Sequence, residues 1–245
     1  MPAEARLVRQ ADSRLSATLL ATMRPSVFAT SLLALSSVSS FHAPSAARSL
    51  ASAAGQAQMS SARVSLGAGC YWGTEKFIKK DFQSLFPSTI KQGAVGFMNP
   101  SPNAPANPSY RDVCSGRTGF VEVYDVEYVG GDSTFEALLR YFYSFHDPTT
   151  TDRQGNDRGT QYASAVFCYT PEQQQIAEKV KLEIQALVDA GKIRAYEGKK
   201  ITTAILPATK FYAAQADHQA YLEKNPWGYC NHAIRWKLAD MGMLR

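Results

Sequence analysis

The sequence has few cysteines, few charged residues and no long hydrophobic run, and each shortage excludes a class of protein. Its 245 residues include four cysteines and no C-x-x-C pair, which disfavours a disulfide-stapled scaffold and a structural zinc site. The moderately apolar stretch 26–38 is too short for a bilayer, which needs roughly 20 residues. With 45% hydrophobic and 19% charged residues the chain is typical of globular proteins. We therefore expect no metal ion and no stable membrane association.

Positive charge is concentrated at the N-terminus. Residues 1–63 hold six arginines, two acidic residues and no lysine, which accounts for four of the five net positive charges. Such a leader, rich in Ser, Ala and Arg, is typical of a transit peptide for an organelle, with a disordered tail as the alternative. The remainder is nearly neutral, so nothing favours a nucleic acid as partner. We divide the chain into a leader at 1–60, a folded domain at 61–230 and a C-terminal tail at 231–245.

The leader fits more than one destination. Translation from Met23 would place Arg24 before the apolar stretch 26–38 and Phe41 shortly after it. This order resembles the bipartite plastid signals of algae with secondary plastids. We therefore favour the plastid, with the mitochondrion as the alternative and the cytosol if the leader has no targeting function.

The distribution of apolar and turn-forming residues predicts an α+β fold. Strands are predicted at 62–66, 89–97, 120–129, 161–169 and 201–206. Helices are predicted from Cys70, over 133–146 behind a Ser133-x-x-Glu136 capping box, after the Thr170-Pro171 cap, and over 213–224. The proline-rich stretch 98–108 reads as a loop. The order indicates a two-layer α/β sandwich with a mixed sheet and a ferredoxin-like core.

Cys70 follows a predicted strand and a glycine turn, at the start of a helix. A strand followed by G-x-G is also typical of dinucleotide sites, but the distance to Gly73 is one residue too long, and Tyr71 and Trp72 would block a pyrophosphate. The free N–H groups and dipole of a helix N-terminus shift a thiol toward the thiolate. Cys70 is thus a candidate nucleophile, with a buried structural thiol as the alternative.

Five ordered blocks resemble the peptide methionine sulfoxide reductase A family. They are GCYWGTE at 69–75, YRDVCSGRTG at 110–119, HDPT at 146–149, QGNDRGTQY at 154–162, and a block from 211 that closes in GYC at 228–230. The first is similar to the family signature GCFWG-x-E. The resemblance implies reduction of the S epimer of methionine sulfoxide, in proteins or free, which repairs oxidative damage.

The resemblance also implies roles for single residues. The catalytic residues would be Cys70, Asp112, Tyr162, Asp157 and Cys230, and the substrate-binding residues Tyr71, Trp72 and Phe97. Cys70 would attack the sulfoxide sulfur and become a sulfenic acid, while Tyr71 and Trp72 hold the substrate methyl group. Asp112 stands for a glutamate acid, Tyr162 for a hydroxyl donor, and Asp157 for an aspartate that orders the network. Phe97 stands for a tyrosine, so one hydroxyl donor is missing there, and Phe97→Tyr is expected to raise turnover.

Recycling of the enzyme needs a second thiol. Cys230, in a C-terminal segment that we expect to be mobile, matches the recycling cysteine of the family. It would form a disulfide with Cys70, which thioredoxin then reduces, and no bound cofactor is expected. No cysteine follows Cys230, so recycling would take one step. Cys114 and Cys168 are assigned to packing, and a monomer is expected.

Two other classes of function stay open. A cysteine hydrolase would pair Cys70 with His146, His218 or His232 and would need no reductant. A binding protein that kept the fold would form no disulfide between Cys70 and Cys230.

Overall fold

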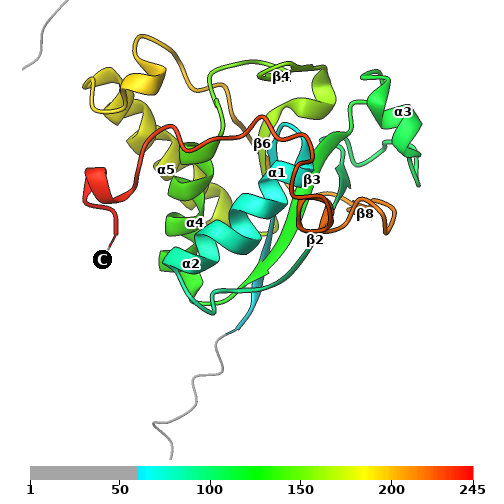
Figure 1. The fold of residues 1–245 in the computed structure, drawn as a ribbon, viewed down its shortest axis with the longest axis horizontal. Coiled ribbons are helices and arrows are strands. Elements are labelled where there is room, and N and C mark those ends of the chain that lie inside the picture. The colour runs from blue at the N-terminus through cyan, green and yellow to red at the C-terminus, as the bar shows by residue number, and fades with distance from the viewer. Residues whose placement is uncertain (1–59, 245) are drawn as a thin grey trace, which may run out of the picture. The chain divides into compact units, whose positions relative to one another are not determined.

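A six-stranded sheet carries the fold of the computed structural model, which describes residues 60–244 (Figure 1). Its strands, in spatial order, are β7 (Ala204–Pro207), β6 (Ser164–Cys168), β1 (Ala62–Ala68), β3 (Val121–Tyr128), β2 (Ile90–Met98) and β8 (Tyr212–Ala213). Neighbouring strands are antiparallel except β6 and β7, which are parallel, so the sheet is mixed. The four inner strands have the ferredoxin-like order. The predicted fold is confirmed.

Helices cover one face of this sheet, and the main core lies beneath them. The longest are α4 (Gly131–Phe145) and α5 (Pro171–Asp189), which contact each other (Figure 1). The others are α1 (Tyr71–Lys76), continued by a π-helical stretch (Phe77–Phe82) and α2 (Gln83–Leu85), then α3 (Tyr110–Cys114) and α6 (Tyr221–Lys224). Even-numbered residues of β1 and β3 face this core, while Val121 and Val123 belong to a smaller cluster on the other face.

A separate two-stranded ladder joins β4 (Arg153–Gln154) to β5 (Asp157–Arg158). Single 3₁₀ turns lie at Thr160–Tyr162, Arg194–Tyr196 and Ala239–Met241. The ladder belongs to one of the sequence blocks that carried the family resemblance.

The two predicted capping boxes have opposite outcomes. At α5 the Thr170 hydroxyl accepts the Gln173 N–H at 3.2 Å, and the box is confirmed. At α4 the predicted box is wrong, because the helix begins at Gly131 after Gly130, whose φ is +103°. The Ser133 hydroxyl instead donates to the Gly130 carbonyl at 3.2 Å.

The predicted helix over 213–224 is also wrong, because only α6 is helical there. The Gln219 side chain bonds both the N–H and the carbonyl of Val95 at 2.8 Å. Ala220 has a left-handed φ of +54° and donates its N–H to Glu75 at 2.9 Å. Contacts with β2 and α1 therefore take the backbone out of a helical path.

The C-terminal segment, red in Figure 1, packs against the end of α4. The N–H groups of Ala233 and Arg235 donate to the Phe145 and Ser144 carbonyls at 3.1 and 2.8 Å. The Trp236 indole is 7% exposed and donates to the Tyr143 carbonyl at 3.1 Å. The segment expected to be mobile is thus tied to the folded body.

Residues 1–59 lie outside the described residues, and with them lie the predicted transit peptide and the start at Met23. Over 60–244, no helix is both long enough and apolar enough to cross a membrane.

Two tryptophans test the packing of the C-terminal segment. We predict that Trp236→Ala lowers the free energy of unfolding by about 3 kcal/mol, because a large buried side chain is lost. Trp227 is 99% exposed, so Trp227→Ala serves as the control and should change the stability by less than about 0.5 kcal/mol. Urea denaturation measures both, and equal effects would contradict the packing described here.

Candidate active site

Cys70 lies at the junction of β1 and α1, where it is the N-cap residue of the helix. Gly69 before it has a φ of +94°, and a Cβ on Gly69 would lie 2.5 Å from the Gln154 Cβ. Glycine is therefore required at this turn for two reasons, its backbone conformation and the close approach of another segment. The predicted position of Cys70 at a helix start is confirmed.

The environment of Cys70 favours the thiol rather than the thiolate. Burial raises its pKa above the ordinary value, and the Glu122 carboxylate adds to the rise. The Trp72 N–H lowers the pKa, as the helix start predicts, but this effect is smaller. The expected shift toward thiolate is therefore wrong for the free enzyme, because burial outweighs the helix N-terminus.

Glu122 is the carboxyl group that raises the pKa of Cys70 most, and it was not among the residues predicted from the sequence. It lies on β3, is 2% exposed, and accepts the Tyr71 N–H at 3.1 Å. Burial raises its pKa to about 8, with a further contribution from Asp157. The group is thus mostly a neutral carboxylic acid at pH 7. Strand alternation could have found it, because Glu122 occupies the same face of β3 as Tyr124 and Val126.

Asp112, expected to be the acid, lies elsewhere. It is exposed in the first turn of α3, where its carboxylate accepts the Ser109 hydroxyl at 2.6 Å and the Ser109 N–H at 3.3 Å. These bonds form a capping box. The structure therefore gives Asp112 a role at a helix end and does not bring it to Cys70.

Two tyrosine hydroxyls lie near Glu122. Burial raises the pKa of Tyr162 and of Tyr110, and the Glu122 carboxylate contributes in both cases. Both hydroxyls therefore stay protonated and can donate hydrogen bonds. Tyr162 was expected here, whereas Tyr110 was not assigned a role. Phe97 is buried, and its ring centroid lies 6.5 Å from that of Tyr110. Phe97 has no hydroxyl group, but the neighbouring Tyr110 has one.

The predicted aromatic pair lies on the first turn of α1. The Tyr71 ring packs against Phe97 at 5.8 Å, and its hydroxyl bonds His218 Nδ1 at 2.8 Å. Trp72 is partly exposed and stacks on Tyr221 at 3.8 Å. Tyr71, Trp72 and Phe97 are thus brought together, with His218 and Tyr221 as additions that the sequence analysis did not assign.

Asp157 holds the segment that contains Cys230. One of its carboxylate oxygens accepts the Tyr229 hydroxyl at 3.1 Å, and the other accepts the Asn231 side-chain amide at 2.7 Å. Cys230 lies between these two anchors and is exposed. Asp157 and Cys230 both add to the rise in the pKa of Cys70, which burial causes first.

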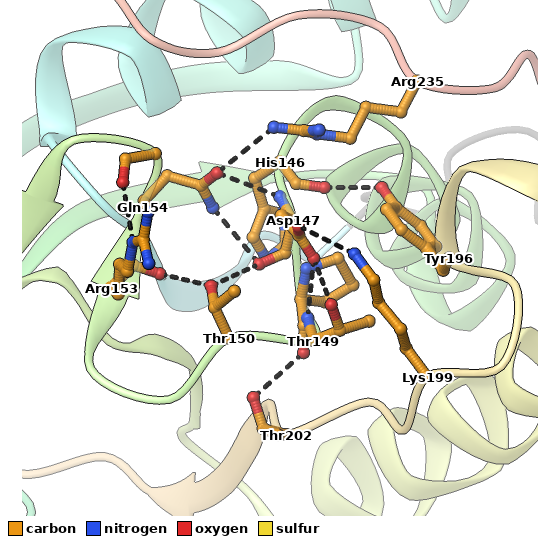
Figure 2. Close-up of polar contacts among 12 residues, drawn as sticks. His146, Asp147, Thr149, Thr150, Arg153, Gln154, Tyr196, Lys199, Thr202 and Arg235 are labelled. Atoms are coloured by element: carbon orange, nitrogen blue, oxygen red, sulfur yellow. Dashed lines mark hydrogen bonds and ion pairs between the residues drawn. The ribbon is translucent and has the colours of Figure 1, made fainter.

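The HDPT and QGND blocks are joined by polar contacts (Figure 2). The Gln154 amide oxygen accepts the Asp147 N–H at 3.1 Å and the Arg235 guanidinium at 3.4 Å. The Gln154 carbonyl accepts the Asn231 amide at 2.6 Å. These contacts fix the chain on the C-terminal side of Cys230.

The histidines considered for a hydrolase are engaged elsewhere. Both ring nitrogens of His146 are bonded in the core, to the Phe142 carbonyl at 2.7 Å and the Ser164 hydroxyl at 2.8 Å. His218 bonds Tyr71, and His232 faces Cys230. Over residues 60–244 no hydrogen bond joins a histidine to Cys70, which disfavours a Cys–His hydrolase.

The remaining cysteines differ in burial. Cys168 is buried in β6, in agreement with packing. Cys114 is partly buried, and its thiol lies beside the Tyr110 hydroxyl.

Comparison with known proteins identifies the family. The family model described as peptide methionine sulfoxide reductase matches residues 62–243. The chain belongs to this family. The match extends beyond Cys230 and includes the segment that packs on α4. The predicted family and the predicted enzyme, peptide methionine sulfoxide reductase A, are confirmed.

Relatives of this reductase support the assignment over most of their length. A probable peptide methionine sulfoxide reductase of Schizosaccharomyces pombe is 38% identical over 177 residues, which covers 71% of this chain and 97% of that protein. MsrA of Methanoculleus marisnigri is 42% identical over 168 residues, which covers 69% of this chain and 93% of that protein. The crystal structure of Mxr1 from Saccharomyces cerevisiae in reduced form is 35% identical, with a TM-score of 0.61 over 72% of this chain and 93% of Mxr1.

The raised pKa of Glu122 can be measured directly. We predict that its side chain keeps its proton at neutral pH and loses it as the pH rises through about 8, because burial penalises the carboxylate. Infrared difference spectroscopy follows the carbonyl band of the protonated acid, and Glu122→Gln identifies the band. Titration near pH 4, the ordinary range of a glutamate, would refute the prediction.

Proposed function

We propose that this reductase acts on the S epimer of methionine sulfoxide, in proteins or free, with Cys70 as nucleophile and Glu122 as acid. The observation that carries the proposal is the hydrogen bond between the Glu122 carboxyl group and the Tyr71 N–H, which holds a protonated acid beside the N-cap thiol. The role expected for Asp112 therefore falls to Glu122.

The reaction needs an acid because a sulfoxide sulfur becomes electrophilic when its oxygen is protonated or hydrogen-bonded. Glu122 donates its proton to that oxygen, and the Cys70 sulfur attacks the substrate sulfur. The carboxylate so formed takes up the proton that the thiol loses. The substrate S–O bond and the transient bond between the two sulfurs then break as the OH group moves to Cys70, which becomes a sulfenic acid. Cys70 is thereby oxidised by two electrons and the substrate is reduced by two to methionine.

Tyr110 and Tyr162 serve as further donors to the sulfoxide oxygen. Both hydroxyls keep their protons, because burial and the nearby Glu122 carboxylate raise their pKa values. Trp72 and Tyr71 offer aromatic faces to the substrate methyl group, a contact suited to polarizable sulfur compounds.

Recycling joins Cys230 to the sulfenic acid of Cys70 as a disulfide. The exposure of Cys230 leaves this bond open to attack by an external dithiol, for which we propose thioredoxin, and no bound cofactor is required. We propose that the enzyme works as a monomer and that the leader directs it to the plastid.

Activity with separated epimers tests the reaction. In a thioredoxin assay coupled to NADPH oxidation we expect turnover of the S epimer and none of the R epimer. Cys70→Ser should abolish turnover, since the nucleophile is lost. Activity with the R epimer alone, or activity that survives Cys70→Ser, excludes the proposal; ester or amide turnover without a reductant would instead favour a hydrolase.

Two carboxylates of this chain form a matched pair for testing the acid. We predict that Glu122→Gln lowers kcat/KM for the sulfoxide by about 10²-fold or more, which is the usual contribution of a general acid. Asp112→Asn should leave kcat/KM nearly unchanged, because its carboxylate caps α3. The reverse ranking would return the role to Asp112. Circular dichroism of both variants checks that each is folded.

A further inference from the structure

His232 is the one titratable group in direct contact with the Cys230 thiol among the hydrogen bonds of residues 60–244. Its Nδ1 lies 3.9 Å from the Cys230 Sγ. The contact places a ring nitrogen against the thiol that has to lose a proton during the proposed recycling.

The tautomer of His232 follows from its other hydrogen bond. Nε2 lies 2.6 Å from the Ala68 carbonyl oxygen, which can only accept, so Nε2 carries the hydrogen. In a neutral imidazole the other nitrogen is then an acceptor. Nδ1 therefore presents a lone pair to Cys230. Burial lowers the pKa of His232 to about 4, and the charges of Arg235 and Lys76 add to this effect, so the ring is neutral at pH 7.

The position of the ring depends on a glycine of the signature block. His232 is 8% exposed and lies against the first turn of α1, where a Cβ on Gly73 would overlap Nδ1. The ring thus fits only because residue 73 has no side chain. Phe77 and Phe145 border it at 6.2 and 5.7 Å between ring centroids.

The Cys230 thiol is also held in place. Asp157 anchors both neighbours of Cys230, Tyr229 and Asn231. Cys230 and His232 both line a cavity of about 510 Å³, which Lys76 and Lys80 line as well. The Cys230 thiol is therefore both held in place and exposed, whereas the His232 ring beside it is buried.

We propose that His232 is the base for disulfide formation, taking the proton of the Cys230 thiol through Nδ1. This rests on the proposed function, which supplies the sulfenic acid on Cys70. The Cys230 sulfur then attacks the Cys70 sulfur, the S–S bond forms and the S–O bond breaks. The leaving hydroxide takes up the proton that His232 accepted and departs as water, so His232 returns to its neutral form. One thiol and one sulfenic acid thus give one disulfide and one water, and no external oxidant is needed.

Single-turnover kinetics without thioredoxin separate this step from sulfoxide reduction. Reduced wild type, His232→Gln and Cys230→Ser are each mixed with excess S-sulfoxide. Quenched samples give the methionine formed, the Cys70–Cys230 disulfide by mass spectrometry, and the sulfenic acid as its dimedone adduct. His232→Gln is expected to form methionine at the wild-type rate, but the disulfide about 10²-fold more slowly, so that the adduct accumulates as it does in Cys230→Ser.

The outcomes distinguish the two proposals. A wild-type rate of disulfide formation in His232→Gln overturns the role of His232. Failure of wild type to form methionine or the disulfide overturns the proposed function itself.

Chemical rescue separates a base from a space-filling side chain. In His232→Gly, added imidazole should restore rapid disulfide formation. Pyrazole has the same shape and is a much weaker base, so it should not. Equal rescue by both compounds would show that the ring only fills space. Circular dichroism checks that His232→Gln and His232→Gly are each folded, and either folded variant provides a test.

Discussion

The close approach of two chain segments to the turn before α1 and to the first turn of α1 is the constraint on which the site depends. Gly69 lets Gln154 approach from one side, and Gly73 leaves room for His232 on the other. A side chain at either position would push one segment away. Since Gln154 anchors Asn231, both glycines govern where the chain around Cys230 lies relative to the helix that begins with Cys70.

Burial has opposite consequences for the reactivity of Glu122 and of Cys70. The pKa of Glu122 rises to about 8 through burial, which supplies an acid at neutral pH. The same burial raises the pKa of Cys70 and so suppresses the thiolate of the free enzyme. The two effects are compatible if the thiol loses its proton only as Glu122 gives up its own. The acid and the nucleophile then work as a coupled pair, and their protons cannot be assigned independently.

Local sequence signals predicted those parts of the fold that depend on local contacts. The Thr170 cap and the strands of the inner sheet needed no knowledge of distant residues. The helix expected over 213–224 failed because Gln219 bonds β2, a contact that no local pattern reveals. At α4, Gly130 adopts a positive φ and starts the helix earlier than the capping box implied. Motif order assigned the acid to Asp112 and did not consider Glu122, because the sequence does not show which carboxyl group is buried.

The fixed position of Cys230 favours the recycling step proposed for it. A thiol on a free tail has to find the sulfenic acid by diffusion of the tail, and it loses conformational entropy when it does so. Here the loss occurs during folding, because Asp157 holds both neighbours of Cys230 and α4 holds the segment that follows. A thiol so placed acts at a high effective concentration toward Cys70. Packing of the C-terminal segment thus lowers the entropic cost of the proposed recycling step.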